Sequence, residues 1–280
     1  MTKHYHMVEK GLALPAPRPG FGVEVTKRLS AQMESALLDG ICDHEVLLSA
    51  DALESYAAFN RRNAATSHHA VAAILENVRN RGVEVTDQAV KFPEPRTVDA
   101  RSNLSLLTSR ASVRTFSGMP VPRDVLLQAA IAAQHAPCVC NRQASHIYFL
   151  TEKEDREKAL SYQNGNRGFG DTADVIAIIT VDIAQMLEPI ERYQHWIDGG
   201  LFAQNFLLAI HAQGYGACPL NWSAPVMCDI GIRKLGYLPP SESIVMMVAI
   251  GALKEAYQVA RSERRPLSDV AHFVSQGCAQ

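Results

Sequence analysis

The chain has 280 residues, enough to bury a sizeable core without disulfides or metals to stabilise it. Its 27 basic and 29 acidic residues leave a net charge of −2, which excludes a general electrostatic attraction to nucleic acid or to anionic membranes. Six scattered cysteines, no secretory signal and no apolar run of membrane-spanning length predict a soluble cytoplasmic protein with reduced thiols.

Residues 1–100 are predicted to form a helical, lightly structured extension, because alanine and leucine recur there at helical spacing. Three helices are expected, at about Lys27–Leu38, Ser49–Arg61 and Ala64–Arg79. In the last of them Val71, Ile74, Leu75 and Val78 share one face. Two prolines within Phe92–Arg96 predict a boundary, after which residues 101–280 form a second domain.

Strands alternate with helices after this boundary. Strands are expected at Ile147–Thr151, Val175–Val181, Tyr215–Leu220 and Ile244–Ile250. The second and fourth are continuous runs rich in valine and isoleucine, which predicts strands covered on both faces. A helix is expected to open at Val121–Asp124 and to bury Leu126, Leu127, Ala130 and Ile131. Another, Asp198–Gln213, is apolar nearly all round, as a central or subunit-interface helix would be, and Gly214 should end it.

Two guanidinium groups and a hydroxyl stand at alternating positions in Arg110, Ser112 and Arg114. In an extended segment these side chains point the same way, so they can converge on one phosphate. Arginine suits such a site, since its planar fork makes charge-assisted hydrogen bonds. The alternative is a solvated polar strand edge.

The segment Ala136–Gln143 is a turn with two amide side chains, Asn141 and Gln143. Amides carry both donors and acceptors and can therefore read the edge of a heteroaromatic ring. Cys138 and Cys140 could instead form a metal or redox site, but a second ligand pair at zinc spacing is missing from the sequence. Buried inert thiols are the simpler interpretation.

Two further segments are suggestive. The glycines of Gly214–Trp222 permit close backbone approach, so a main-chain N–H could face a ligand, although an ordinary helix-to-strand turn explains them equally well. The basic segment Arg261–Leu267 follows the last expected strand and is either an anion contact or a solvated tail. The histidines, including His4, His6, His68 and His69, lack carboxylates or cysteines at metal-site spacing.

Together the four segments resemble the nitroreductase superfamily of FMN enzymes, over about Leu106–Val270. The family's R-x-S-x-R-x-F motif matches Arg110, Ser112, Arg114 and Phe116. Its A-P-S-x-x-N-x-Q turn matches Ala136, Pro137, Asn141 and Gln143, with Cys138 at the usual serine. Its G-x-G-x-C-P stretch matches Gly214–Pro219, and its R-x-P element matches Arg264 and Pro266. Asn164–Asp171 resembles a family loop that contributes an amide and sometimes a cation near the flavin.

The resemblance implies a set of FMN contacts, with main-chain groups near Leu220 and Asn221 beside the flavin N5 edge. The implied cofactor-binding residues are Arg110, Ala111, Ser112, Arg114, Pro137, Cys138, Asn141, Gln143, Asn166, Arg167, Pro219, Leu220, Asn221 and Arg264. Arg114 or Arg167 would place positive charge near the N1 side of the flavin. The resemblance implies no catalytic side chain and no metal, because the chemistry of the family takes place at the flavin.

The implied fold is an α+β, three-layer sandwich with a mostly antiparallel central sheet flanked by helices, assembled as an intertwined homodimer. FMN would lie at the interface, with the Pro137–Gln143 turn facing a flavin whose phosphate is held by the arginines of the other subunit. The implied activity is a ping-pong hydride transfer from NADH or NADPH, through FMN, to a small conjugated acceptor such as a nitro compound, quinone or enone.

Alternatives remain open at this stage. The chain could be an FMN-dependent dehydrogenase, dehalogenase or flavin-fragmenting relative, or a flavin-free binding or scaffold protein. The segments His6–Leu12 and Arg18–Gly22 resemble a header of some longer family members. The extension that they begin could cover the flavin cleft as a lid or enlarge the dimer interface.

Overall fold

The computed structural model describes residues 1–91 and 99–274. Contacts divide the chain into two compact units. The first comprises Met1–Ala100, Gln134–Ser145 and Val181–Phe202, and the second comprises Arg101–Ala133, His146–Thr180 and Ala203–Gln280. The predicted boundary at Phe92–Arg96 lies outside the described residues, and the division into domains at residue 100 stays a prediction.

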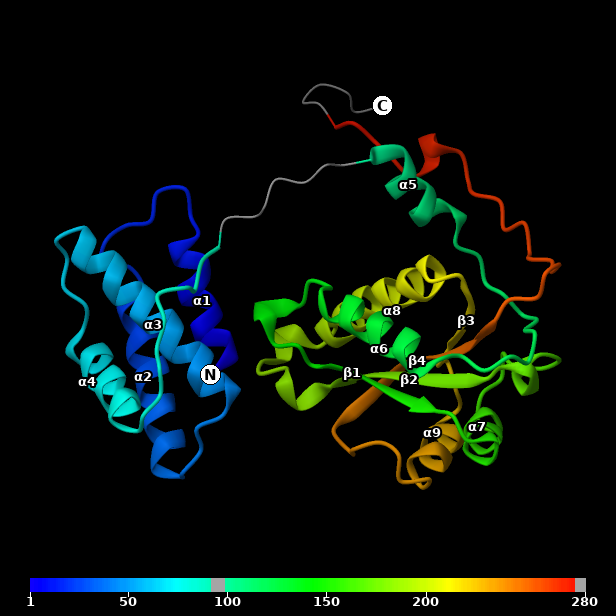
Figure 1. The fold of residues 1–280 in the computed structure, drawn as a ribbon, viewed down its shortest axis with the longest axis horizontal. Helices are drawn as coiled ribbons and strands as arrows, with labels where there is room; N and C mark the ends of the chain where they lie inside the picture. Colours follow the sequence, from blue (N-terminus) through cyan, green and yellow to red (C-terminus); the bar gives the residue numbers. More distant parts are fainter. Residues whose placement is uncertain (92–98, 275–280) are drawn as a thin grey trace. The chain divides into compact units, whose positions relative to one another are not determined.

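The first unit contains a bundle of four helices (Figure 1). They are α1 (Thr2–Leu12), α2 (Val23–Leu38), α3 (His44–Arg62) and α4 (His69–Asn80). The helices enclose their own apolar core, in which Leu29, Met33, Leu53 and Tyr56 are fully buried. The predicted face of the last helix is confirmed, since Val71, Ile74, Leu75 and Val78 are all buried in this core.

Several details of the N-terminal prediction were wrong, and α2 and α3 begin four and five residues before the expected Lys27 and Ser49. The segment is a packed bundle and not a lightly structured one. The helix expected from Ala64 begins at His69, because Ala64 has a φ of 51° and the His68 ring caps the helix by accepting a hydrogen bond from Ala70 N. Helix α1 was not anticipated, since only Tyr5 and Val8 of its residues are buried and its apolar pattern is weak. A Cβ at Gly11 would collide with the ring of Phe21.

The remaining elements form a four-stranded sheet with helices. In chain order they are α5 (Ala100–Ser109), α6 (Arg123–Gln134), β1 (Ser145–Leu150), α7 (Lys153–Leu160), β2 (Val175–Asp182), α8 (Gln194–Ala212), β3 (Tyr215–Asn221), α9 (Val226–Arg233) and β4 (Glu242–Ala252). The strand order is β1-β2-β4-β3. β3 and β4 are antiparallel, with Tyr215 opposite Ala252 and Asn221 opposite Met246. All four predicted strands are confirmed, with ends within two residues of the prediction.

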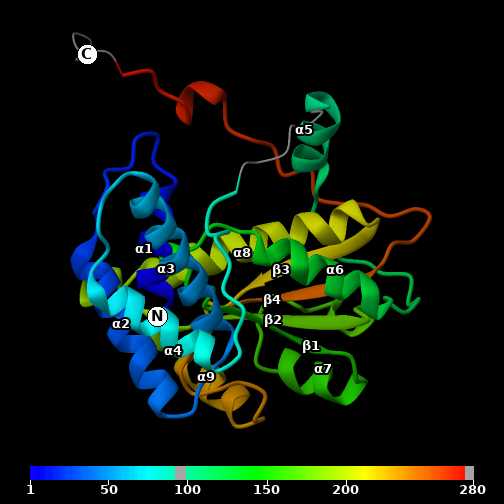
Figure 2. The same cartoon turned by 60° about the vertical axis from the view of Figure 1, so that its left-hand side comes forward.

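The sheet lies between two layers of helices. α6 and α8 lie on one face, and α7 and α9 on the other (Figures 1 and 2). Residues Val175 to Val181 of β2 are all buried, which confirms the prediction that this strand is covered on both faces. Ile176 and Ile178 join Leu160 of α7 and Ile232 of α9 in one core cluster. Among the described residues, no helix is both long and apolar enough to cross a membrane.

The predicted buried face of α6 was partly wrong. Leu126, Ala129 and Ala133 are buried, whereas Leu127 and Ile131 are 44% and 48% exposed. The buried stripe follows positions i, i+3 and i+7, which turns Leu127 and Ile131 away from the sheet.

The segment from Arg110 to Phe116 lies along β3. Val113 N donates to the carbonyl of Ala217 at 3.0 Å, and Ser112 forms a parallel bridge with Ala217. Val113 and Phe116 are buried in the core. Glycines on the sheet make room for both: a Cβ at Gly216 would lie 3.1 Å from Val113 Cβ, and one at Gly251 would lie 2.6 Å from Phe116 Cγ.

We therefore expect Gly251→Ala to lower the free energy of unfolding by about 2 kcal/mol, because the Phe116 ring leaves no space for a methyl group. Urea denaturation measures this change in the free energy of unfolding. Gly200→Ala is the control, since a Cβ there meets no atom of the described residues within 4 Å and alanine favours the helix. A Gly251→Ala protein as stable as the wild type would contradict this account of the packing.

Candidate functional site

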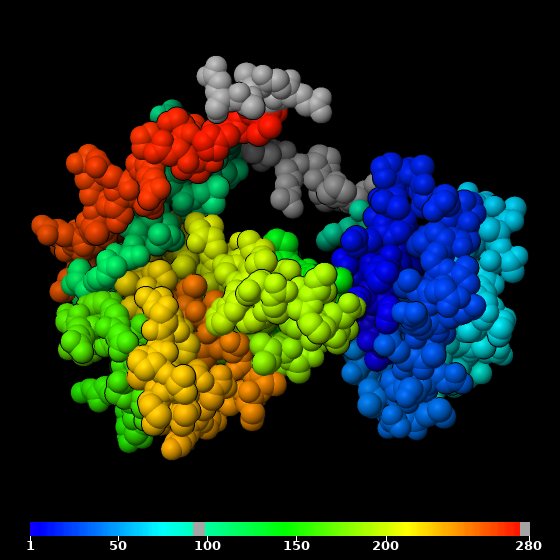
Figure 3. All heavy atoms as spheres, turned by 180° about the vertical axis from the view of Figure 1, so that it is seen from behind, coloured from blue at the N-terminus to red at the C-terminus, as the bar shows by residue number. Residues whose placement is uncertain are grey.

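Four arginines line one cleft of the second unit, and three of them, Arg110, Arg114 and Arg264, are predicted site residues. The cleft has a volume of about 700 Å³ and is lined by residues 108–112, Arg114 and residues 259–264. Arg110 and Arg114 come from the segment beside β3, and Arg264 comes from the C-terminal segment that follows β4. In Figure 3 the orange C-terminal segment lies next to the teal-green residues around Arg110. The structure thus brings together guanidinium groups that are far apart in the sequence.

These guanidinium groups have few protein partners. Within the described part of the chain, Arg110 Nη1 is buried and has no hydrogen-bond partner, which costs about 1 to 3 kcal/mol unless an acceptor is bound. Arg264 Nη1 donates to the carbonyl of Ser262 at 2.7 Å. Arg261, in contrast, is paired with Glu263 at 2.5 Å. The donors of Arg110, Arg114 and Arg264, with the Ser112 hydroxyl, suit an anion such as a phosphate.

Two titratable groups lie near these arginines. Burial lowers the pKa of His211, and the positive charge of Arg110 lowers it further. His211 is therefore neutral at pH 7, and its Nε2 lies 2.9 Å from Ser109 Oγ. Burial raises the pKa of Cys218, although Arg114 and Arg110 oppose the rise. The charge of the cleft therefore comes from its guanidinium groups.

The turn predicted to face a ring has a strained backbone. Cys140, Asn141 and Gln143 have φ values of 49°, 52° and 54°. A left-handed conformation costs a residue other than glycine roughly 1 to 2 kcal/mol, and asparagine tolerates it best. Such strain persists only where the surroundings impose it, and it is typical of functional sites. The turn includes a short 3-10 helix, η1 (Val139–Asn141).

Hydrogen bonds from two directions hold this turn. Asp198 of α8 accepts from Val139 N at 3.1 Å and from Gln194 Nε2 at 2.8 Å. Cys138 Sγ accepts from Gln143 N at 3.4 Å. Burial raises the pKa of the Cys138 thiol, so it stays protonated at pH 7.

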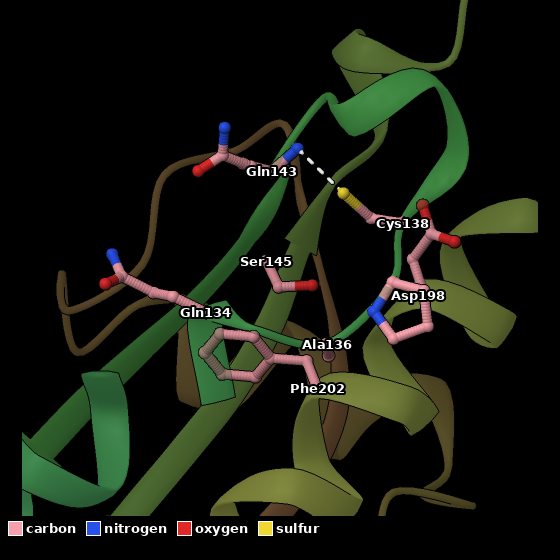
Figure 4. Close-up of a pocket in the computed structure, with 8 residues that line it drawn as sticks. Gln134, Ala136, Cys138, Gln143, Ser145, Asp198 and Phe202 are labelled. Carbon is pink, nitrogen blue, oxygen red and sulfur yellow. Dashed lines mark hydrogen bonds between the residues drawn. The ribbon is translucent and has the colours of Figure 1, made fainter. Parts of the chain in front are cut away.

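A pocket of about 50 Å³ lies beside the turn, with Cys138, Gln143, Ser145 and Phe202 around it (Figure 4). A pocket of this size holds a few water molecules and not a tricyclic ring.

Sequence reasoning missed a buried ion pair in the turn. Arg142 is 7% exposed and makes two hydrogen bonds to Glu191, at 2.9 and 2.7 Å. Glu191 belongs to η4 (Pro189–Glu191) and also accepts from Leu187 N at 2.9 Å. These bonds lower the pKa of Glu191 to about 2. No local sequence pattern marks this ion pair or Asp198. The only signal in the sequence is the charged Arg142 between the amides of Asn141 and Gln143.

The two site residues predicted in the loop Asn164–Asp171, Asn166 and Arg167, differ in their contacts. Asn166 Nδ2 donates to the carbonyls of Leu160, at 2.9 Å, and Gln163, at 2.5 Å, so its amide nitrogen holds its own loop. Arg167 is exposed. Gln163 Nε2 donates to the carbonyl of Asn221 at 2.9 Å, which ties this loop to the end of β3.

Most residues of the glycine-rich segment Gly214–Trp222 are explained by their role in the fold. Gly214 has a φ of 81° and follows the end of α8, as predicted. The Leu220 side chain is buried in the core, so only its main chain is available to a ligand. Asn221 is exposed, and its Oδ1 accepts from Ser223 N at 3.0 Å. Pro219, between the two buried residues Cys218 and Leu220, is half-buried.

Metal-binding groups do not cluster in the residues that the structure describes: no three His, Cys, Asp or Glu side chains come close enough to hold an ion. Cys138 and Cys140 are both present as thiols. Cys278 lies outside the described residues.

The fold and site define a class: a three-layer α+β sandwich with a cationic cleft at the sheet edge. The sequence model of the nitroreductase family matches residues 107–163 and 152–252, together more than half of the chain. The chain therefore belongs to the nitroreductase family.

Individual relatives agree with this assignment. A Cr(VI) reductase of Pseudomonas sp. (strain G-1) is 29% identical over 126 residues, which are 40% of this chain and 51% of that protein. The chain thus spans about half the length of this curated relative.

Solved structures share the fold. A protein from Desulfovibrio desulfuricans, solved in complex with FMN, has a TM-score of 0.54 and 21% identity over 64% of this chain and 99% of its own. A nitroreductase-like protein from Streptococcus mutans has a TM-score of 0.52 and 18% identity over 62% of this chain and 98% of its own.

The buried pair predicts a pH-dependent contribution to stability. The pKa of Glu191 is lowered in the folded state, so its contribution is complete above about pH 5 and is lost as the pH falls towards about 2. We expect Glu191→Gln to destabilise the protein by about 2 kcal/mol at pH 7 and by progressively less below pH 4.5.

Urea unfolding at several pH values measures the difference. Glu154→Gln removes an exposed carboxylate that is paired with Lys158 at 2.8 Å, and this control should leave stability unchanged. A Glu191→Gln effect of the same size at pH 7 and pH 3 would rule out this role for the ion pair.

Proposed function

We propose that this protein is an FMN-dependent oxidoreductase that uses NADH or NADPH to reduce a small conjugated acceptor, such as a nitro compound, quinone or enone. The observation that carries the proposal is the convergence of Arg110, Arg114 and Arg264 on one cleft in a member of the nitroreductase family. A protein of the same fold has been solved with FMN.

The cleft fits the phosphate end of FMN. Arg110 offers a buried nitrogen that has no partner among the described residues, and the cleft volume of about 700 Å³ exceeds what a phosphate needs. We assign the phosphate to Arg110, Arg114 and Arg264, with the Ser112 hydroxyl and the main chain of Ala111 as further donors. Each charge-assisted bond of this kind contributes roughly 1.5 to 3 kcal/mol.

The ring system is assigned to the strained turn. Pro137, Cys138, Asn141 and Gln143 would contact its edge, and the turn's rigidity fixes where their polar groups point. The main chain at Pro219–Asn221 is assigned to the N5 side. Asn166 would act through its carbonyl oxygen, because its amide nitrogen is engaged within its loop. Because Arg114 is assigned to the phosphate, Arg167 is the candidate for the positive charge near N1.

A second copy of the chain would complete each site. The pocket beside the turn is too small for a flavin ring in one chain. The first unit also exposes a run of large apolar side chains between 40% and 80% exposed: Ile183, Leu187, Ile190, Tyr193, Trp196, Ile197 and Leu201. Soluble proteins cover apolar surface of this kind with a partner, and a homodimer is the simplest arrangement.

Bound FMN would supply the redox chemistry, namely hydride transfer from NAD(P)H and delivery of two electrons to an acceptor that binds in the same place after the nucleotide has left. The protein binds and orients these groups, and the cationic side chains favour the negative charge of the reduced flavin. Nothing in the site singles out a side chain as proton donor, so we assign the proton to solvent.

We expect Arg110→Ala and Arg264→Ala each to weaken FMN binding about 10- to 150-fold, and the double variant by roughly 3 to 6 kcal/mol. Flavin titration followed by fluorescence quenching measures the affinity. Arg265→Ala, which removes the same charge one residue away and outside the cleft, is the matched control. The wild type should bind one FMN per chain and sediment with the mass of two chains. Unchanged affinity in the double variant would refute the phosphate assignment.

Steady-state assays test the reaction itself. The FMN-loaded protein should oxidise NADH or NADPH when a nitroaromatic compound or a quinone is present, and chromate is a further acceptor to assay because a relative is a Cr(VI) reductase. Reaction with neither nucleotide would favour an FMN-dependent dehydrogenase, dehalogenase or flavin-fragmenting activity. A protein that stays colourless after dialysis against FMN would favour a flavin-free binding function.

A further inference from the structure

Gln163 is a buried amide that connects the loop after α7 to the end of β3. Its side chain is taken out of solvent, since the residue is only 6% exposed. Its Nε2 donates to the carbonyl of Asn221, the last residue of β3, at 2.9 Å. Its Oε1 accepts from Gly165 N at 2.5 Å, within the loop. Glutamine is mostly found at protein surfaces, and burial is tolerated here because both ends of the amide are bonded.

The orientation of the Gln163 amide is fixed by its neighbours. A main-chain carbonyl only accepts hydrogen bonds and a main-chain N–H only donates them, so the two ends of this amide cannot exchange places. The main-chain carbonyl of Gln163 in turn accepts from Asn166 Nδ2 at 2.5 Å. One residue therefore joins the side chain of Asn166 to the main chain of Asn221.

The bond to Asn221 fixes the last peptide group of β3. A peptide group is planar and trans, so its C=O and its N–H point in opposite directions. Because the Asn221 carbonyl is turned towards Gln163, the N–H of Trp222 is turned away from it. Two side-chain bonds hold the chain beyond this peptide group: Asn221 Oδ1 accepts from Ser223 N at 3.0 Å, and Trp222 Nε1 donates to Asp229 Oδ1 at 3.1 Å. The main chain at the end of β3 therefore has one defined orientation.

We propose that Gln163 is a positioning residue of the cofactor site. By holding the Asn221 carbonyl it sets how the main chain at the end of β3 faces the cofactor, and its bonds to the loop keep Asn166 at a fixed position relative to that strand. The inference rests on the proposed function, which assigns Asn166 and the Pro219–Asn221 main chain to the flavin. Its structural half, the bond between the loop and β3, concerns the flavin-free protein alone.

Hydrogen exchange in the flavin-free protein tests the structural half. Gln163→Glu keeps an acceptor for Gly165 N but places a second oxygen against the Asn221 carbonyl, whereas Gln163→Met removes both bonds at similar volume. At pH 8, well above the ordinary pKa of a carboxyl group, we expect amides of residues 220–224 to exchange about tenfold faster in both variants. Amides of residues 163–166 should exchange faster only in Gln163→Met.

Gln213→Glu is the matched control. Gln213 precedes the other end of β3, and its Nε2 likewise donates to a main-chain carbonyl, that of Val125, at 3.1 Å. The same substitution there removes the same kind of bond and should leave exchange of residues 220–224 unchanged.

Single-turnover reduction of the FMN-loaded protein tests the positioning role. We expect both Gln163 variants to slow flavin reduction by NADH or NADPH about tenfold, because the main chain on the N5 side is no longer held in place. Their FMN affinity should change less than about twofold, since the phosphate contacts of the arginines are untouched. A general loss of structure would instead weaken FMN binding and slow reduction together.

Three results would overturn the inference: wild-type exchange of residues 220–224 in both Gln163 variants, equal acceleration there in Gln213→Glu, or accelerated exchange with an unchanged rate of flavin reduction. Failure of the wild type to bind FMN would count against the proposed function only, since the exchange measurement needs no flavin.

Discussion

The position of the cationic cleft depends on one constraint, the burial of two side chains from the segment beside β3. Val113 and Phe116 must enter the core, where Gly216 and Gly251 leave space for them. Arg114 lies between these two buried residues and is itself exposed, so its guanidinium group stays in the cleft. The charged side chains of this segment have no place in the core, and the chain after β4 brings Arg264 to the same side.

Much of the fold could be predicted because its signals are local. The strands β2 and β4 are continuous apolar runs, and a glycine ends α8. The elements that were missed lack such signals: α7 has the sequence KEDREKAL, with only two buried residues at its end, and α1 buries only Tyr5 and Val8. On α6 the pattern allowed two adjacent apolar stripes, and the sequence alone does not tell which one packs on the sheet.

The candidate site was predictable only in part, for a related reason. Arginines at alternating positions and paired amides can be recognised in the sequence because these side chains have characteristic binding chemistry. Asp198 and Glu191 hold the same turn from distant positions, and nothing around them in sequence indicates it. For Asn166, the residue type was informative but its hydrogen bonds within the loop were not foreseeable. Long-range partners are chosen by tertiary structure, which a single sequence does not display.

The left-handed turn also has a consequence for anyone who would engineer this protein to withstand heat. Cys140 and Gln143 occupy backbone conformations that glycine would adopt with less strain, so replacing either one offers an inexpensive gain in resistance to unfolding. The gain would come with a looser peptide chain at the place where polar groups must be aimed. Stability and binding selectivity are therefore opposed at these two positions. Stabilising substitutions are better placed in exposed loops elsewhere.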